Sequence, residues 1–167
     1  MTTTNYHNAD QIIPRLWLGD SVASIDTDFL NSNNITVIFN CTKDLPFSSI
    51  AGHKYRVPID DNLQPEEIRN MSLWSPEIAL TILKEYNNGH NILVHCYAGM
   101  QRSAASVALF LIAGYHLSPV ASINYIRSRR PIAFTPMPNF AESIINFYNN
   151  YITNIAPYLD KNNNQYQ

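Results

Sequence analysis

The sequence predicts an α/β fold in which a central, mostly parallel sheet is flanked by helices on both faces. Short apolar segments rich in β-branched residues, at 35–41 (ITVIFNC) and 91–95 (NILVH), are typical of strands buried on both faces of a sheet. Helical patterns lie between and after these strands. Strands that alternate with helices favour parallel pairing with helices on both sides.

The elements before the second buried strand are expected to be short. Residues 11–19 (QIIPRLWLG) indicate a short strand with a turn. Ser21 can cap a helix to about Asn31, with apolar residues at positions 22, 25, 29 and 30 on one side. Another short strand is expected at 54–59. A helix follows over about 74–87, because Ile78, Ile82 and Tyr86 recur every four residues.

The elements after strand 91–95 are all expected to be helices. The segment from Ala104 onward is apolar nearly all round, so its helix should be central. Ser118 and Pro119 start a helix that runs to about Arg129. Prolines at 131, 136 and 138 keep the next loop non-helical, and Asn139 caps a last helix to about Thr153.

Composition is that of one globular domain. The chain has 167 residues, of which 46% are hydrophobic, and its formal net charge is −2. We therefore expect a polar N-terminal segment at 1–10, one folded domain at 11–155 and a polar C-terminal tail at 156–167, of which residues 161–167 should be frayed. There is no polybasic run and no apolar run of about 18 residues, so neither nucleic acid nor a membrane is expected as a partner. Nothing in the sequence indicates an oligomeric state.

Cysteine and histidine usage favours an intracellular protein without a metal. Two cysteines make no disulfide framework, which favours a reducing compartment, with the cytoplasm expected and the nucleus as the alternative. The four histidines other than His95 show no metal-ligand spacing and are interpreted as surface or packing residues. They are His7, His53, His90 and His116.

The segment HCYAGMQRS (95–103) lies where a buried strand gives way to a buried helix. Ligands of open α/β sheets bind beyond the carboxyl ends of the strands, and a helix N-terminus there favours an anion. The loop amides can curl into a nest for phosphate, with Gly99 supplying the unusual backbone angle. The phosphate-binding residues expected in this loop are Tyr97, Ala98, Gly99, Met100, Gln101 and Arg102.

The side chains of this loop suit nucleophilic chemistry on phosphate. A thiol at a helix N-terminus has a lowered pKa, so Cys96 is the expected nucleophile. The planar fork of Arg102 matches two phosphate oxygens and can stabilise the transition state. Ser103 can donate its hydroxyl to the Cys96 sulfur, and His95 can support the loop through its ring nitrogens.

HCYAGMQRS resembles the H-C-x-x-G-x-x-R-S/T signature of the protein tyrosine phosphatase superfamily, and more narrowly the dual-specificity phosphatases. The likeness extends to LWLGD (16–20), ITVIFNCT (35–42) and INYIRSRRP (123–131), and so over roughly residues 12–151. It implies a single-domain dual-specificity phosphatase-like fold, a cysteinyl-phosphate intermediate, phosphoprotein substrates, and neither cofactor nor metal. The chain is too short for the extra elements that deepen the pocket of larger, tyrosine-only enzymes.

The general acid is expected in VPIDD (57–61). The family pattern I-P-x-x-D ends on the acid, which selects Asp61 here. Asp60 is the alternative, and a plain Asx-turn without catalytic function is the third interpretation. The spacing to Cys96 is somewhat longer than the family's, and the extra length is expected at 62–70.

Three more positions follow from the resemblance. Arg130 would contact a second anion, or would join Arg127 and Arg129 on a solvated basic face. Met137 stands after Pro136, where the family tends to have an asparagine that bonds to the cysteine loop. Cys41 would end the strand beside Cys96, either as a redox partner for it or as a buried free cysteine.

Three functions compete at this stage. The first is hydrolysis of phosphotyrosine and phosphoserine/threonine in proteins. The second is hydrolysis of a non-protein substrate, such as an RNA 5′-phosphate or a phosphoinositide, but the loop carries no charge at 97, 98, 100 and 101 and RS is followed by Ala104. The third is a non-catalytic phosphoprotein-binding module, which would need neither the thiol nor the acid.

Overall fold

A five-stranded sheet forms the centre of the protein, in the order β1-β2-β5-β3-β4. The computed structural model describes residues 6–50 and 52–163, with side chains up to 159. The edge strand β1 is antiparallel to β2, and all other neighbours pair in parallel. This confirms the predicted mostly parallel α/β sheet. The strands are β1 (Ala9–Ile13), β2 (Leu16–Gly19), β3 (Ile35–Asn40), β4 (His53–Arg56) and β5 (Asn91–His95).

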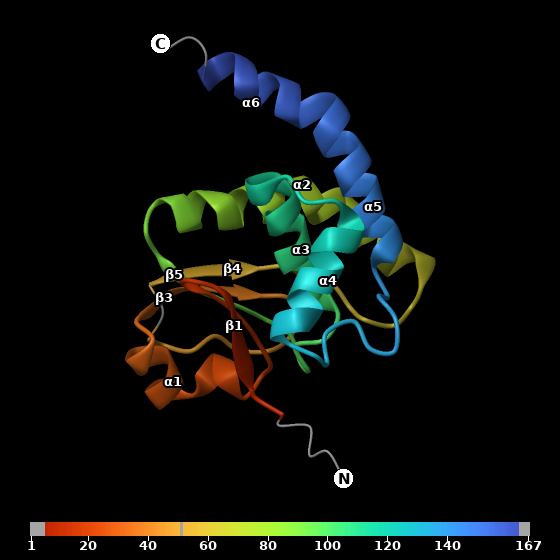
Figure 1. Ribbon diagram of the computed structural model, residues 1–167. Coiled ribbons are helices and arrows are strands. Elements are labelled where there is room, and N and C mark those ends of the chain that lie inside the picture. Colours follow the sequence, from red (N-terminus) through yellow and green to blue (C-terminus); the bar gives the residue numbers. More distant parts are fainter. Residues whose placement is uncertain (1–5, 51, 164–167) are drawn as a thin grey trace.

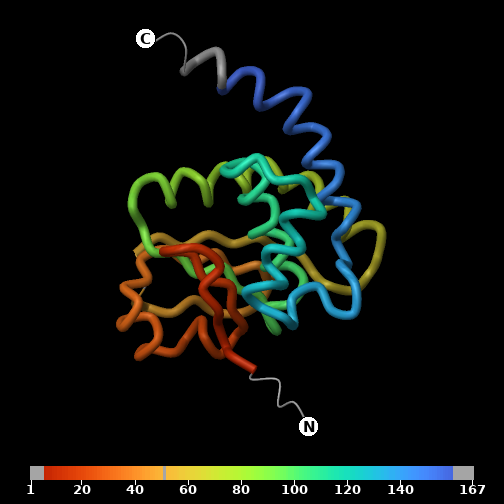
Figure 2. The backbone as a smooth tube through the Cα atoms, viewed as in Figure 1, coloured from red at the N-terminus to blue at the C-terminus, as the bar shows by residue number. Residues whose placement is uncertain are grey.

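Helices cover both faces of the sheet unequally (Figure 1). Four helices lie on one face: α2 (Pro65–Asn87), α3 (Arg102–Tyr115), α4 (Pro119–Arg129) and α5 (Ala141–Asn150). A 3-10 turn (Ala23–Ile25) and the short helix α1 (Thr27–Ser32) lie on the other. A π-helical turn (Tyr151–Ile155) joins α5 to α6 (Ala156–Asn163), which points away from the sheet (Figure 2).

The helix that follows the cysteine loop is the centre of the larger core. Every residue of α3 from Arg102 to Ala113 is buried, as its all-round apolar sequence predicts. It packs between the sheet and helices α2, α4 and α5. A smaller core on the opposite face includes Leu30, Ile38 and Leu93. The loop before α3 is therefore anchored in the most densely buried part of the molecule.

The predicted helix from Ser21 to about Asn31 is wrong in its start and its inner face. Two aspartates divide the segment. The Asp20 carboxylate accepts from the Ala23 amide at 2.9 Å, and the Asp26 carboxylate caps α1 by accepting from the Phe29 amide at 3.1 Å. Val22 and Ile25 are consequently exposed instead of packed on the sheet.

Helix α2 begins nine residues earlier than expected (74 − 65), at Pro65. Proline is favoured at the first position of a helix, and Glu66 and Glu67 in its first turn suit the positive end of the dipole. The helix continues past Pro76, where the Ser75 hydroxyl donates to the Met71 carbonyl at 2.6 Å. Most of the segment 62–70 is thus helix, and the extra residues before Cys96 do not form a long loop.

The predictions for the chain's end and for the edges of strands need smaller corrections. Asn139 does not cap α5, which starts at Ala141 after Phe140 without a side-chain cap. Residues 156–163 are helical, whereas a polar tail that frays from Lys161 onward was expected. Strand β4 runs from 53 to 56, whereas a strand at 54–59 was predicted. Ser118 does cap α4 as predicted, since its hydroxyl accepts from the Ala121 amide at 3.1 Å.

No described helix is by itself long and apolar enough to span a membrane. Only α3 and α4 taken together, with a bend of 119° between them, pass on length and composition.

Candidate active site

The loop 96–101 connects the carboxyl end of β5 to the N-terminus of α3. Its sharp turn depends on Gly99, whose φ of +65° is unfavourable for residues with a side chain. A Cβ atom at this position would also lie 2.6 Å from the Gly19 carbonyl oxygen and 2.8 Å from Nη2 of Arg130. Both the angle and the space therefore require glycine here.

Cys96 lies at the bottom of this loop, in a setting that favours the thiolate. Burial of the sulfur opposes ionisation, but several contacts outweigh it and lower the pKa of Cys96. They are the Ser103 hydroxyl, 3.1 Å from the sulfur, the amides of Ser103 and Gly99, and the Arg102 charge. Since the thiolate is the reactive form, the geometry supports a nucleophile at residue 96.

The Arg102 guanidinium uses only some of its hydrogen-bond donors within the protein. Nη1 donates to the Ile59 carbonyl at 3.0 Å, which links the cysteine loop to the loop carrying Asp61. Its Nε is buried and has no hydrogen-bond partner among the residues that the structure describes. A buried guanidinium with donors to spare is the group that an anionic ligand would satisfy.

His95 contacts the loop through one of its two ring nitrogens, whereas Nε2 has no partner among the described residues. The ring is fully buried, and its Nδ1 donates to the Cys96 carbonyl at 3.2 Å. Burial lowers the pKa of His95 to about 4, so the ring is neutral near pH 7. A neutral ring leaves Arg102 as the positive side chain beside the thiol.

A pocket of about 280 Å³ opens above the sulfur. Most of the phosphate-binding residues expected in the loop line it, and Thr135, Asn139 and Asp61 close it from two other segments. The residues lining it are Asp61, Cys96, Tyr97, Ala98, Met100, Gln101, Arg102, Thr135 and Asn139. The cysteine loop and Asp61, which were predicted from two separate segments, thus line one cavity, to which Thr135 and Asn139 add a third segment that was not predicted.

The two aspartates of VPIDD have different surroundings. Asp61 lines the pocket, and its Oδ1 accepts from Nδ2 of Asn139 at 2.9 Å. Asp60 is not among the pocket residues, and its carboxylate pairs with Lys43 at 3.0 Å. Its amide is held by Glu67, whose Oε2 accepts at 2.8 Å. The geometry favours Asp61 over Asp60 as the proton donor, and the role itself remains a prediction.

The sequence missed Glu67 and Asn139 as supporting residues, and it missed a second role of Gln101, which was expected only to bind phosphate. The Gln101 side chain donates to the carbonyls of Thr135 and Met137 and accepts from the Asn139 amide at 2.9 Å. The segment after α4 is therefore bonded to the cysteine loop despite the methionine at 137. Asn139 carried no signal because Asp61 is 78 residues away, and Glu67, seven residues from Asp60, belongs to no motif that would indicate its contact.

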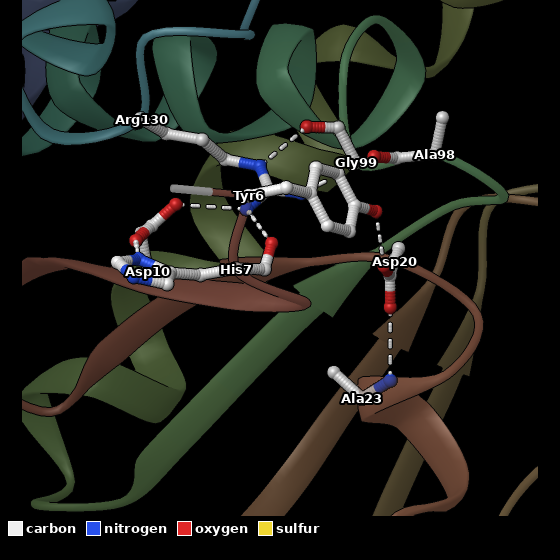
Figure 3. Close-up of polar contacts among 8 residues, drawn as sticks. All are labelled: Tyr6, His7, Asp10, Asp20, Ala23, Ala98, Gly99 and Arg130. Carbon is white, nitrogen blue, oxygen red and sulfur yellow. Dashed lines mark hydrogen bonds and ion pairs between the residues drawn. The ribbon is translucent and has the colours of Figure 1, made fainter. Parts of the chain in front are cut away.

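Arg130 does not have either of its expected roles. Its side chain is fully buried, so it lies neither on a solvated basic face nor open to a second anion. Figure 3 shows it directed at the back of the cysteine loop, where its Nε donates to the Gly99 carbonyl at 2.8 Å. Nη2 donates to the Ala98 carbonyl at 3.2 Å. Arg130 fixes the loop's carbonyl groups and not a ligand.

The N-terminal segment completes this contact. Nη1 of Arg130 donates to the His7 carbonyl and pairs with the Asp10 carboxylate, both at 2.8 Å (Figure 3). Tyr6 donates its hydroxyl to Asp20 nearby. Residues counted in the polar segment 1–10 therefore help to hold the active-site loop in place.

Cys41 lies just beyond β3, next to the nucleophile's strand. Its amide donates to the His95 carbonyl at 2.8 Å, and its sulfur lies 3.4 Å from the Ser106 hydroxyl. Both cysteines are free, and burial raises the pKa of Cys41 to about 12. Cys41 is thus a protonated, buried thiol, and redox pairing with Cys96 stays a prediction.

Comparison with known proteins identifies the family. The family model for the dual specificity phosphatase catalytic domain matches residues 16–150. The chain belongs to the dual-specificity phosphatase family. Dual specificity protein phosphatase 21 of Homo sapiens is 30% identical over 142 residues, covering 84% of this chain and 72% of that protein. Dual specificity protein phosphatase 2 of Mus musculus is 30% identical over 133 residues, covering 78% of this chain.

Solved structures share the fold. The crystal structure of DUSP15 matches with a TM-score of 0.79 and 26% identity, covering 93% of this chain and 97% of that one. Human DUSP28 matches with a TM-score of 0.75 and 21% identity, covering 89% and 97% of the two chains. Several curated relatives are much longer, since the chain spans 39% of the mouse phosphatase 2.

Proposed function

We propose that this protein is a cysteine-dependent phosphatase that hydrolyses phosphotyrosine and phosphoserine or phosphothreonine in proteins. One observation carries the proposal: a single pocket joins the Cys96 thiol, the Arg102 guanidinium and the Asp61 carboxyl. These groups are a nucleophile, an anion clamp and a proton donor, which are the parts that phosphoryl transfer through sulfur needs. Family membership supports phosphoprotein substrates in general.

The reaction would proceed in two displacements. The Cys96 thiolate attacks phosphorus as the bond to the leaving oxygen breaks, and Asp61 protonates that oxygen. Arg102 and the loop amides stabilise the charge on the other phosphate oxygens. In the second step water attacks the cysteinyl phosphate and gives a proton to the Asp61 carboxylate. The P–S bond breaks, phosphate leaves, and the thiolate returns with help from the Ser103 hydroxyl, 3.1 Å away.

The choice of protein substrates depends on the pocket wall. Apart from Arg102 and the Cys96 thiolate, the loop side chains that line the pocket are uncharged, and Tyr97 is 51% exposed. A polyanionic substrate such as an RNA 5′-triphosphate or a phosphoinositide needs more cations than Arg102 alone. Because Arg130 is buried in contacts with the protein, it does not supply a second one.

The test compares Cys96→Ser with the unchanged protein on four substrates: a phosphotyrosyl peptide, a phosphothreonyl peptide, a 5′-triphosphate RNA and a phosphoinositide. We expect turnover of the peptides alone, abolished by Cys96→Ser, and a cysteinyl phosphate in mass spectra of acid-quenched protein. Normal turnover by Cys96→Ser would disprove the mechanism. Faster turnover of RNA or lipid would move the substrate class to the alternative.

A further inference from the structure

Three side chains that can bind a metal lie outside the active site, near the amino-terminal ends of β4 and β5, whereas the active site lies at the carboxyl ends of the strands. His53 is the first residue of β4, and His90 directly precedes β5. Glu85 lies in the last turn of α2, which packs beside them. Cys96 follows the other end of β5, roughly 17 Å along a strand of five residues. The phosphatase mechanism uses none of these three side chains.

Their geometry is that of a preformed ligand set. Each offers one ligand atom, and these atoms all lie within 4.8 Å of one another. Oε2 of Glu85 is 3.0 Å from Nδ1 of His53 and 3.5 Å from Nε2 of His90. Zinc bonds of about 2.0–2.1 Å place neighbouring tetrahedral ligands roughly 3.3–3.4 Å apart. Two of the three edges therefore match a zinc site with only small adjustments.

Outer contacts already orient the would-be ligands. The other oxygen of Glu85 accepts from the Tyr55 hydroxyl at 2.7 Å. The other ring nitrogen of His90 lies 2.9 Å from the Thr36 hydroxyl. Hydrogen bonds of this kind fix the tautomer of a metal-binding histidine and the direction of a carboxylate. Arg15 further pins the His90 carbonyl at 2.9 Å.

Burial and charge favour a cation at this point. The Glu85 side chain is only 4% exposed, whereas those of His53 and His90 are 52% and 30% exposed. A cation bound here would balance the negative charge of this largely buried carboxylate.

We propose that His53, Glu85 and His90 bind a zinc ion through Nδ1, Oε2 and Nε2, with water at the solvent-facing fourth position. Two imidazoles and a carboxylate are a ligand set that zinc accepts. The ion would join the edge strand β4 to α2 and to the start of β5. Its role would therefore be to stabilise the fold, and the site is independent of the phosphatase proposal.

Sequence spacing gave no signal for this site. His53 and His90 are 37 residues apart (90 − 53), and only the parallel alignment of β4 and β5 on either side of β3 brings their ends together. Ring centroids of the two histidines lie 4.9 Å apart. Their earlier interpretation as separate surface or packing residues is therefore incomplete.

The test is zinc titration by calorimetry of chelator-treated protein carrying Cys96→Ser, so that the catalytic thiol cannot capture the metal. We expect one zinc per chain and a higher melting temperature. Adding His53→Gln or His90→Gln should weaken binding at least tenfold and remove the thermal shift. Tyr55→Phe, which keeps all three ligands, should weaken binding about tenfold.

His7→Gln is the matched control, because His7 is an exposed histidine that also pairs with a carboxylate, Asp10 at 2.8 Å, and is not one of the proposed zinc ligands. It should leave zinc binding unchanged. Cobalt(II) offers a second readout, since its absorption spectrum should show nitrogen and oxygen ligands without a thiolate charge-transfer band. Equal zinc affinity in the parent and both histidine variants, or no binding by the parent, would overturn the proposal.

Discussion

Two arginines approach the cysteine loop from opposite sides and are used in opposite ways. Arg130 directs donors at the carbonyls of Ala98, Gly99 and His7 and at the Asp10 carboxylate. Arg102 gives one hydrogen bond to the Ile59 carbonyl, and its Nε is unpartnered among the described residues. Both side chains are buried, so burial alone does not distinguish a ligand-binding arginine from a structural one. The unused donors do.

The division follows from the peptide groups of the loop. When successive amides turn inward to form an anion nest, their carbonyl oxygens turn outward and need donors of their own. Arg130 supplies donors for two of these carbonyls from behind, on the side shown in Figure 3. The inward amides and Arg102 then remain for phosphate. The back of the loop is thus a condition for the chemistry at its front.

Replacing Arg102 should give the largest effect and should act on catalysis. Arg102→Met removes the charge and the fork that hold the phosphate oxygens, so kcat/KM for p-nitrophenyl phosphate should fall about 10³-fold or more. Arg102→Lys keeps the charge but loses the fork and should recover little. Loss of stability without loss of kcat/KM per folded molecule would contradict the role assigned to Arg102.

Replacing Arg130 should act on stability first. Arg130→Met leaves the carbonyls of the loop and the Asp10 carboxylate without donors, which should lower the free energy of unfolding by about 3–5 kcal/mol in urea titrations. Arg129→Met, one residue earlier on the exposed side of α4, is the matched control and should change stability by about 0.5 kcal/mol or less. Equal effects of the two variants would mean that Arg130 does not anchor the loop.

Asp61 and Asp60 can be compared in the same way, to test which of them is the general acid. Asp61→Asn should lower kcat about 10²-fold, since the leaving oxygen loses its proton donor. Asp60→Asn disturbs an exposed pair with Lys43 and should change kcat only slightly. Substrates with a very acidic leaving group should be less sensitive to Asp61→Asn, because they need little protonation. A larger decrease of kcat in Asp60→Asn than in Asp61→Asn would mean that Asp60 is the general acid.

Local chemistry made the front of the site predictable. Cys96, Gly99, Arg102 and Ser103 lie within eight residues (103 − 96 + 1) between a strand and a helix that are both apolar, so their meeting place follows from chain connectivity. The parallel sheet and the central helix followed from the same short-range patterns. Asp61 needed the family pattern, because nothing local separates it from Asp60.

Long-range contacts made the back of the site unpredictable. Nη1 of Arg130 donates to the His7 carbonyl and the Asp10 carboxylate, which are more than a hundred positions away in sequence. A sequence pattern cannot distinguish an arginine with such a contact from a solvated one. The same holds for Gln101 with the segment 135–139, which lies 34 or more positions away. The prediction of where α1 starts was wrong for a different reason, because Asp20 and Asp26 compete with Ser21 as caps.

The smallest expected effect is a shift in the pKa of Cys96. It should follow a change on the sulfur side of the loop but not a change on the Arg130 side. Ser103→Ala removes the hydroxyl 3.1 Å from the sulfur, the strongest of the contacts that lower the pKa of Cys96, so the pKa should rise. Alkylation by iodoacetamide requires the thiolate, and its rate increases as pH rises through that pKa. The midpoint of the rate–pH curve should therefore move to higher pH in Ser103→Ala. Asp10→Asn, which alters the contacts of Asp10 with Arg130 and His7 behind the loop, should leave the midpoint in place. An equal shift would mean that contacts on both sides of the loop affect the pKa of the sulfur.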